Sequence, residues 1–321
     1  MSKKISTQTI AFAIIILVAF LGIAALLLSQ SKTTVKSPNT NSNLNSGILK
    51  ISTSFYPLEF LAKEIGGSLA VVTNITPAGT EPHEYEPTPQ QIIAIGQSDL
   101  LLVNGAGLES WSAKITQGEI APKAVVKLTK PFELSEIEEQ GKKVQDPHIW
   151  LSPANYIKMA RYVSQSMQQN QNEANQAIIQ INTGSLIKKL EILSNNYKTK
   201  LNPTNCKINK FVTNHDAFNY LAKDYGLEAL SISGLSPEAE PTSKELAELA
   251  EVIKSNNIKY VLTETVASPK LADTLAKEVG ITTLELNPLE GLTSDEISNG
   301  KNYISVMEEN LKNLALALDC K

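Results

Sequence analysis

Histidine and cysteine, the residues that most often bind transition metals, are scarce in this sequence. The 321 residues include three histidines and two cysteines. The spacing of Cys206 and Cys320 does not suit a metal site. A transition-metal site in this chain would therefore be built mainly from its three histidines, with carboxylates as the further donors.

Several signatures of catalysis and of nucleotide binding are also missing. No Gly-Lys-Ser/Thr phosphate loop occurs, and Gly105-Ala106-Gly107 lacks the third glycine of a dinucleotide fingerprint. The stretch His83-Glu84-Tyr85-Glu86-Pro87 has proline where a metalloprotease motif carries its second histidine. The net charge of -4 and the lack of a long Lys/Arg run argue against a nucleic-acid partner. These absences exclude the common nucleotide-dependent and nucleic-acid-binding classes.

The N-terminal part differs in composition from the rest of the chain. Lys3 and Lys4 precede an uncharged apolar run over residues 10–28, and about 20 apolar residues span a bilayer. We expect residues 1–29 to form an uncleaved membrane anchor that leaves the rest of the chain outside the cytoplasm. A cleavable signal segment is the alternative, and no cysteine follows the run to carry a lipid. The polar residues 30–47 predict a flexible linker.

Short β-branched runs alternate with helical segments in the rest of the chain. Thr88 and Ser243 are expected to cap two of the helices. This alternation predicts an α/β fold with parallel sheets covered on both faces. Two similar four-stranded lobes are expected, over residues 48–170 and 202–321. The predicted strands are residues 48–55, 70–75, 99–104, 123–129, 210–214, 227–233, 260–265 and 282–286; the predicted helices are residues 57–66, 88–97, 108–117, 155–168, 216–225, 243–255, 269–279 and 302–318.

One long helix is expected to join the two lobes over residues 171–201. The segment from residue 172 to 201 contains no proline, and Gly184 is its one weak point. Its apolar residues recur at helical spacing, which predicts a buried stripe. The members of this stripe are Ala177, Ile178, Ile181, Leu186, Leu190, Leu193 and Tyr197.

The three histidines lie in similar local contexts. His83, His148 and His215 each stand beside Pro, Asn or Asp in short segments where a strand or loop should end. Three neutral imidazoles suit zinc, although each histidine could instead be bonded locally. A water in the fourth position would allow hydrolysis, whereas a carboxylate would close the site for binding. Glu264 and Glu290, at predicted strand ends, are the candidate carboxylates.

Six motifs occur in order between about residue 48 and residue 321: Pro82-His83-Glu84-Tyr85-Glu86-Pro87, Asn104-Gly105-Ala106-Gly107-Leu108-Glu109-Ser110-Trp111, Asp146-Pro147-His148-Ile149-Trp150, Asn214-His215-Asp216-Ala217-Phe218, Ser236-Pro237-Glu238-Ala239-Glu240-Pro241 and Asn287-Pro288-Leu289-Glu290-Gly291-Leu292. Together they resemble the ligand segments and other motifs of the solute-binding proteins of zinc and manganese ABC importers, in particular their high-affinity, ZnuA-like zinc branch.

The resemblance implies two α/β lobes joined by one long helix, with the metal held between them. It further implies a Zn2+-binding protein outside the cytoplasm that is not an enzyme. Its partners would be the membrane permease and ATPase of an ABC importer, and the membrane through its N-terminal segment. We expect it to be a monomer.

The resemblance also implies a ligand set of His83 and His148 from the first lobe with His215 and Glu290 from the second. Many members of the family have Asp where this chain has Asn287. Glu290 is therefore the expected fourth ligand, with Asn287 and Glu264 as alternatives, and Glu264 is expected to accept a hydrogen bond from a ligand histidine. Zinc-specific members often carry a histidine-rich loop where residues 133–145 are acidic and contain no histidine.

Three other functions are open at this point. A manganese-binding member of the same family would favour more oxygen ligands. A metal-stabilised adhesin would use the ion only for its fold. A secreted zinc hydrolase would use Glu264 or Glu290 as a general base. In each case an oxidising compartment permits a disulfide between Cys206 and Cys320, with two free thiols as the alternative.

Overall fold

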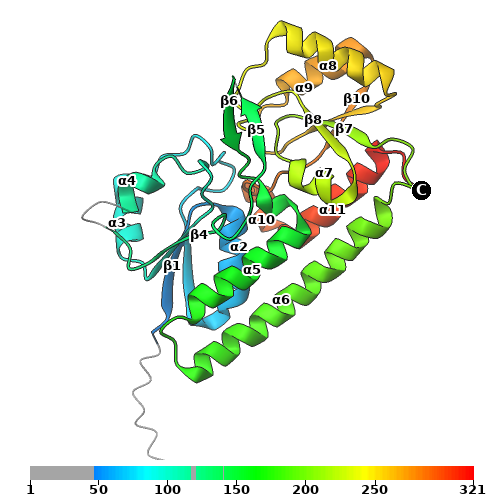
Figure 1. Ribbon diagram of the computed structural model, residues 1–321. Coiled ribbons are helices and arrows are strands. Elements are labelled where there is room, and N and C mark those ends of the chain that lie inside the picture. Colours follow the sequence, from blue (N-terminus) through cyan, green and yellow to red (C-terminus); the bar gives the residue numbers. More distant parts are fainter. Residues whose placement is uncertain (1–46, 117–120, 140) are drawn as a thin grey trace, which may run out of the picture. The chain divides into compact units, whose positions relative to one another are not determined.

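The computed structural model describes residues 47–116, 121–139 and 141–321, of which Ile48–Lys321 form one compact unit (Figure 1). The anchor predicted for residues 1–29, and all but the last residue of the linker predicted for residues 30–47, lie outside the described residues. Among the residues that are described, no helix combines the length and apolar character needed to cross a membrane.

Two four-stranded parallel sheets form the framework of the described chain. The first has the order β2-β1-β3-β4, and the second has the order β10-β9-β7-β8. Counted along the chain within each sheet, both orders are 2-1-3-4, so the two lobes share one topology. The strands are β1 (Leu49–Thr53), β2 (Ala70–Asn74), β3 (Leu100–Val103), β4 (Val125–Lys127), β7 (Lys210–Thr213), β8 (Glu228–Ser231), β9 (Tyr260–Thr263) and β10 (Thr282–Glu285).

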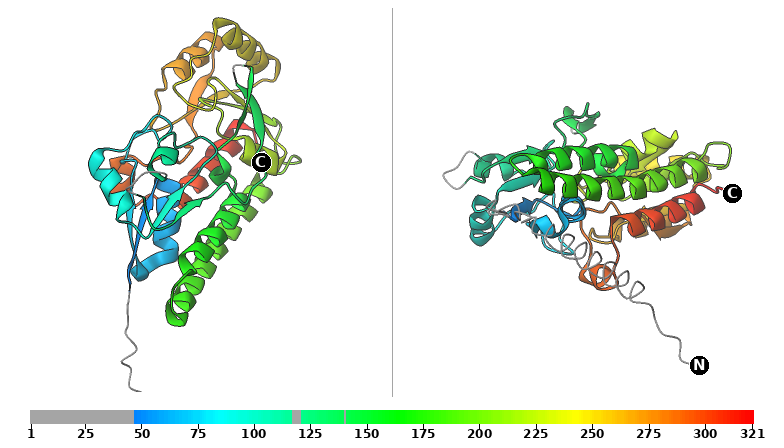
Figure 2. Two further views of the ribbon diagram at one scale, coloured as in Figure 1. Left: turned by 60° about the vertical axis from the view of Figure 1, so that its left-hand side comes forward. Right: turned by 90° about the horizontal axis from the view of Figure 1, so that it is seen from below.

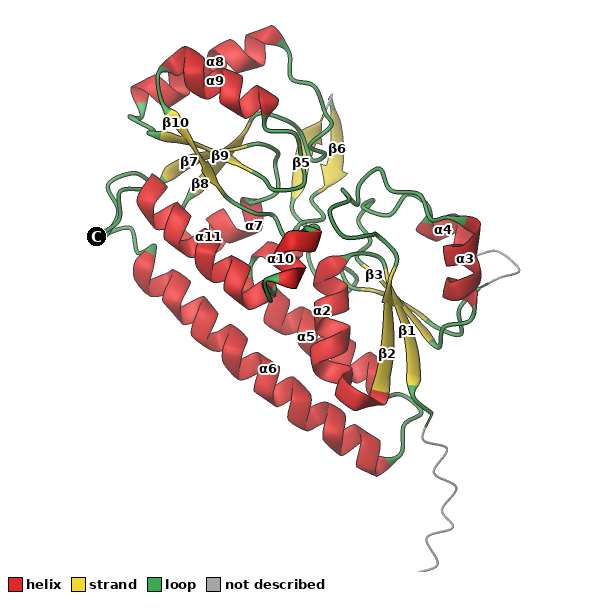
Figure 3. Cartoon of the chain, turned by 180° about the vertical axis from the view of Figure 1, so that it is seen from behind, coloured by secondary structure: helices red, strands yellow, loops and turns green. Residues whose placement is uncertain are grey.

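Helices cover both faces of each sheet, as Figure 3 shows for the first lobe. Strand β3 shows this in its burial pattern: successive side chains point to opposite faces of the sheet, and all four are buried. Leu100 and Leu102 pack in the large cluster that includes α2, whereas Leu101 and Val103 face the cluster that contains Ile95 and Trp111. The helices are α2 (Tyr56–Gly66), α3 (Pro89–Gly96), α4 (Ser112–Thr116), α5 (Pro153–Gln168), α7 (Asn219–Tyr225), α8 (Ser243–Ser255), α9 (Lys270–Val279), α10 (Ser294–Ser298) and α11 (Tyr303–Ala317).

The long helix α6 (Glu173–Lys200) joins the lobes, and its 28 residues span about 42 Å. It lies beside α5 and also packs against α2 of the first lobe and α11 of the second (Figure 2). The predicted fold class, two α/β lobes with four-stranded parallel sheets and one long helix, is confirmed. The domain bounds 48–170, 171–201 and 202–321 stay predictions, because the compact unit Ile48–Lys321 contains both lobes.

The predicted apolar stripe of α6 was partly wrong. Ile178 and Ile181 are 39% and 71% exposed, and Ala177 is exposed as well. The N-terminal half of the helix instead buries Asn175, Ile179 and Thr183. Thr183 is polar but donates a hydrogen bond to the Ile179 carbonyl oxygen at 2.6 Å. Burial of such hydrogen-bonded polar residues is invisible to a search for apolar periodicity.

One further local prediction was wrong, and one element had not been predicted. Helix α8 is capped by Thr242 rather than Ser243, because the Thr242 hydroxyl accepts from the Glu245 amide and the Glu245 side chain returns to the Thr242 amide. The acidic region 133–145 contains an antiparallel hairpin of β5 (Glu136–Glu139) and β6 (Lys142–Gln145), in which Ile137 pairs with Val144. The predicted Thr88 cap of α3 is confirmed.

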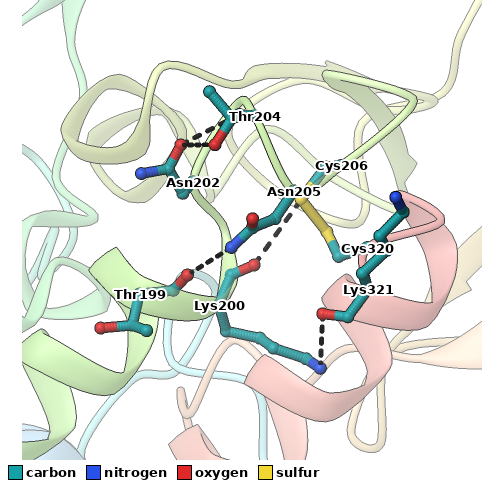
Figure 4. Close-up of a disulfide and its surroundings, with 8 residues drawn as sticks. All are labelled: Thr199, Lys200, Asn202, Thr204, Asn205, Cys206, Cys320 and Lys321. Carbon is teal, nitrogen blue, oxygen red and sulfur yellow. Dashed lines mark hydrogen bonds between the residues drawn. A yellow bond between two sulfur atoms is a disulfide. The ribbon is translucent and has the colours of Figure 1, made fainter.

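The predicted disulfide between Cys206 and Cys320 is also confirmed (Figure 4). The two residues pair as an antiparallel bridge, flanked by a hydrogen bond of 3.0 Å from the Lys321 amide to the Asn205 carbonyl oxygen. Lys200, at the end of α6, donates from Nζ to the Lys321 carbonyl oxygen at 3.1 Å. The bridge therefore fastens the chain end after α11 to the segment that leads into β7.

Candidate metal centre

The three histidines and Glu290 each lie in a segment that follows a strand. His83 lies in the loop after β2, His215 lies just after β7, and Glu290 lies in the loop after β10. His148 follows β6, whose hairpin is inserted after β4. Carboxyl ends of parallel strands meet at one edge of a sheet, where ligands of open α/β sheets usually bind. The fold thus brings together residues that are far apart in the sequence.

The four side chains form a compact set of donor atoms. One donor from each of His83, His148, His215 and Glu290 lies within 4.8 Å of all the others. Glu290 Oε1 is 3.1 Å from His83 Nε2, 3.4 Å from His148 Nε2 and 3.1 Å from His215 Nε2. His83 Nε2 and His148 Nε2 are 3.3 Å apart. With metal–ligand bonds of about 2.0–2.2 Å, the donors of a tetrahedral zinc site lie roughly 3.3–3.6 Å apart, so the set is close to that size.

The burial of this centre is uneven. The side chains of His148, His215 and Glu290 are 0% exposed, whereas that of His83 is 10% exposed. Among the described residues, the second carboxylate oxygen of Glu290 is buried and has no hydrogen-bond partner. An unpartnered buried carboxylate oxygen is costly unless a cation or water satisfies it. The residues present therefore fit a bound dication, and the centre meets solvent on the side of His83.

The carboxylates and histidines of the cluster shift one another's pKa values toward their charged forms. Burial opposes the charged form of His215, but Glu264 and Glu290 outweigh it and raise the pKa of His215 well above its ordinary value of 6.5. Burial likewise opposes charging of His148, and its hydrogen bonds with Asp146 and Glu290 raise its pKa. Burial disfavours the Glu290 carboxylate, yet the histidines, His215 foremost, hold its pKa well below its ordinary value of 4.5. Protons and a metal ion would thus compete for the imidazole nitrogens, and the same carboxylates stabilise either positive charge.

Asp146 fixes the orientation of His148. Its Oδ1 accepts from the His148 amide at 3.0 Å and lies 2.9 Å from His148 Nδ1. This contact assigns the proton to Nδ1 and leaves Nε2 free to act as a ligand. Two residues of α7 hold Asp146 in turn. Asn219 Nδ2 donates to Asp146 Oδ2 at 3.2 Å, and the Tyr220 hydroxyl donates to the Asp146 carbonyl oxygen at 3.0 Å. Sequence reasoning did not single out Asp146, although its place two residues before a candidate ligand was a usable signal.

Glu264 occupies the corresponding position behind His215. It directly follows β9, and its Oε1 lies 2.6 Å from His215 Nδ1 and accepts from the His215 amide at 3.2 Å. It is not one of the four clustered donors. The geometry therefore places it as an acceptor that orients His215.

Asn287 shapes the loop that carries Glu290. Its Oδ1 accepts from the Leu289 amide at 2.7 Å, and its Nδ2 donates to Thr265 Oγ1 at 2.9 Å and Glu296 Oε1 at 3.3 Å. Leu289 has a left-handed backbone, with φ 59°, and is fully buried. Both polar ends of the Asn287 side chain are thus used within the loop, so the structure does not turn it toward the donor set.

A buried network outside the ligands supports the segment that carries His148, and sequence reasoning did not identify it. Glu109 is buried and accepts from the Ser54 hydroxyl at 2.6 Å and from the Asn104 and Gly105 amides at 2.7 and 2.9 Å. Burial raises the pKa of this carboxyl group. Asn104 Nδ2 then donates to the Pro147 carbonyl oxygen at 2.9 Å. Glu109 and Asn104 therefore support the site through the backbone beside His148.

Comparison with known proteins gives one consistent result. Residues 51–317 match the family model described as zinc-uptake complex component A, periplasmic. The zinc-binding lipoprotein AdcA of Streptococcus pneumoniae is 39% identical over 292 residues, which are 87% of this chain and 58% of that protein. The high-affinity zinc uptake system protein ZnuA of Bacillus subtilis is 36% identical over 276 residues, covering 82% of this chain and 85% of the relative. The chain thus spans about 58% of the length of the AdcA relative.

A solved structure agrees with these matches. The Zn(II)-bound ZnuA-like domain of Streptococcus pneumoniae AdcA superposes with a TM-score of 0.73 at 41% sequence identity. The match covers 84% of this chain and 99% of that domain. The similarity therefore extends over both lobes and over the segments that contribute the donor set.

Proposed function

Because the chain belongs to the ZnuA family of zinc-uptake complex components, we propose that it binds one Zn2+ ion between its lobes and delivers it to an ABC importer. The ligands in this proposal are His83, His148, His215 and Glu290. The supporting observation is the donor set itself, in which Glu290 Oε1 lies 3.1–3.4 Å from three imidazole nitrogens. The zinc is cargo, so the protein acts as a binding component and not as an enzyme.

The donor chemistry favours zinc over manganese. Three imidazole nitrogens and one carboxylate suit zinc, whereas manganese favours sites richer in carboxylate, carbonyl and water oxygens. Asp146 and Glu264 lie behind two of the histidines and add negative charge without adding oxygen ligands. With Glu290, the three carboxylates offset the charge of a dication in a buried place.

The same geometry speaks against a zinc hydrolase. A hydrolytic zinc needs an open position for water, and such sites usually keep three protein ligands. Here four donors already approach tetrahedral spacing, and three of their side chains are 0% exposed. Glu264 is engaged with His215 and Glu290 belongs to the donor set, so neither is placed as a free general base.

We infer that the folded part works outside the cytoplasm as a monomer, and that its partners are the permease and ATPase of an ABC importer, of which it meets the membrane permease. The AdcA relative is named a lipoprotein, but in this chain the first cysteine is Cys206, within the folded part. Residues 1–47 therefore contain no cysteine that could carry a lipid. The apolar run of residues 10–28 would instead anchor the chain, or release it after cleavage.

The proposal is tested by zinc competition with a chelator of known affinity, using residues 48–321. One equivalent of zinc is expected to bind, and His148→Ala should weaken binding by at least about tenfold, roughly 1.4 kcal/mol. Asn182→Ala is the control, because it removes a polar contact to the Ile65 carbonyl oxygen, away from the donor set. Unchanged affinity in the His148 variant would reject the proposed site, and metal analysis of protein from its native membrane would identify the natural ion.

A further inference from the structure

We infer that Glu81 is an entry ligand, a carboxylate that binds the incoming Zn2+ before it reaches the four buried donors. This inference rests on the proposed zinc-binding function and adds a residue that controls the rate of exchange. Glu81 lies on the side of the centre, beside His83, from which a hydrated ion can arrive. The final four-donor set is unchanged by it.

The exposed fractions identify the entrance. Three of the four donor side chains have no exposed surface, and only His83 among them reaches solvent, at 10%. The side chain of Glu81 is 13% exposed. The two residues are therefore partly exposed neighbours at the mouth of a centre whose other donors are enclosed.

Glu81 is held with its carboxylate toward the imidazole of His83. Its Oε1 accepts from the His83 amide at 2.9 Å, and its Oε2 accepts from the Glu84 amide at 3.3 Å. The same Oε1 lies 3.9 Å from His83 Nε2, the atom that faces Glu290 Oε1 at 3.1 Å. A carboxylate has about four lone-pair sites, so two amide contacts leave each oxygen able to bind a cation.

The chemistry of zinc transfer explains what such a carboxylate does. A hydrated zinc ion must exchange its waters for protein donors, and zinc sites can expand to five ligands in a transition state. A carboxylate beside the first imidazole replaces water early, when the ion has not yet met His148, His215 and Glu290. Since Glu81 is not one of the four clustered donors, the contact is transient and stabilises the transition state of entry.

A transient ligand leaves a specific kinetic signature. An interaction made only in the transition state changes rates and leaves the equilibrium between free and bound states unaffected. Removing it should therefore slow zinc binding and zinc release by the same factor. A permanent ligand or a residue that only supports the fold would instead raise the dissociation rate or lower stability.

The test is stopped-flow exchange of zinc between the full folded part, residues 48–321, and a fluorescent zinc chelator. For Glu81→Gln we expect the association and dissociation rate constants both to fall by about tenfold, while Kd changes by less than about threefold. Glu84→Gln is the matched control. Glu84 is an exposed acid in the same loop and contacts Glu81 only through its backbone amide. Its substitution by Gln therefore removes the same charge as Glu81→Gln and leaves that contact in place.

The outcomes separate this inference from the proposed function. Equal association rates in Glu81→Gln and Glu84→Gln would overturn the entry role and assign any slowing to general electrostatic attraction. A faster dissociation rate with unchanged association would also overturn it. Glu81→Asp keeps the charge but withdraws the oxygens by one methylene, so it should slow exchange less than Glu81→Gln. Failure of the unsubstituted protein to bind zinc would instead reject the proposed function.

Discussion

The indole nitrogen of Trp150 donates a hydrogen bond of 2.8 Å to the carbonyl oxygen of Pro288. Trp150 follows His148 by two residues, and Pro288 precedes Glu290 by two residues. The contact joins the two lobes directly beside the donor set. Tyr303 of α11 adds a second link, from its hydroxyl to the Trp150 carbonyl oxygen at 2.6 Å. The relative position of His148 and Glu290 is thus set by buried hydrogen bonds as well as by helix α6.

Replacing Trp150 by phenylalanine should weaken both the fold and the site. The change leaves the Pro288 carbonyl oxygen buried without its donor, which costs about 1–3 kcal/mol of unfolding free energy. We expect zinc affinity to fall by about tenfold as well, because the support of a ligand segment is lost. Trp111→Phe is the control, since Trp111 is buried in the separate cluster with Ile95 and Leu101. Thermal unfolding measures the stability of both variants, and chelator competition measures their zinc affinity. A Trp150→Phe variant that loses stability but keeps its zinc affinity would contradict the prediction.

Glu290→Gln should mainly lower zinc affinity, whereas Asn287→Ala should mainly lower stability. Glu290→Gln removes a ligand charge and is expected to lower zinc affinity by at least about tenfold, roughly 1.4 kcal/mol. Asn287→Ala leaves the buried Leu289 amide without its acceptor and removes one donor to Glu296, so it should mainly lower stability, by about 1–3 kcal/mol. Both variants need the same two measurements, affinity and unfolding free energy. A larger loss of affinity in Asn287→Ala would show that Glu290 is not the fourth ligand.

The strand–helix rhythm was predictable because each strand and helix carries a local signal. Four buried residues in β3, and the threonine and proline that open α3, are recognisable without partners. The shared strand order 2-1-3-4 was not predictable, because pairing between strands depends on contacts distant in the sequence. The hairpin β5–β6 was missed for a related reason, since its one inward pair, Ile137 and Val144, is a weak local signal among charged residues.

The candidate site was predictable only as a set of residue types and contexts. Histidines in loops after strands indicated the donors, and His83, His215 and Glu290 lie at the carboxyl ends of parallel strands, where ligands of such sheets usually bind. The residues that orient them were harder to find, because their effect depends on geometry. Asp146 is close to His148 in sequence, but Asn219 and Trp150 act across the lobes. No local pattern distinguishes such residues from ordinary buried polar or aromatic ones.

The stability of the metal-free protein should fall as pH rises above neutrality. The pKa values of His148 and His215 are raised above 6.5 in the folded state, so their contribution is complete below pH 6.5 and is lost as pH rises through the raised values. Zinc binding requires neutral imidazoles, so the stabilisation by zinc should grow over the same interval. Thermal unfolding at pH 6 and pH 9, with chelator and with zinc, checks both trends.

Substitution of His215 provides the control for this pH effect. His215→Gln removes one of the two imidazoles whose pKa is raised, so the metal-free variant should lose less stability between pH 6 and pH 9 than the wild-type protein. A wild-type protein whose metal-free stability stays constant or rises over that interval would contradict the assigned directions. At the acid end, the lowered pKa of Glu290 predicts a loss of stability as pH falls below 4.5.

Removal of the disulfide should affect stability and leave zinc binding nearly unchanged. Cys206 precedes β7, at the edge of the sheet opposite the donor set. We expect Cys206→Ser with Cys320→Ser to lower the unfolding free energy by about 2–5 kcal/mol and to change zinc affinity by less than about threefold. A reducing agent should destabilise the wild-type protein to the same extent and have no effect on the double variant. A large loss of zinc affinity would show that the chain end communicates with the centre.

The central claim is that three histidines and Glu290 hold one zinc ion between the lobes. Its most direct test is a crystal structure of zinc-loaded protein with anomalous data collected on both sides of the zinc absorption edge. The account predicts one strong zinc peak about 2.0–2.2 Å from His83 Nε2, His148 Nε2, His215 Nε2 and a Glu290 oxygen. A peak bound elsewhere, or one at this centre with water in place of Glu290, would contradict it.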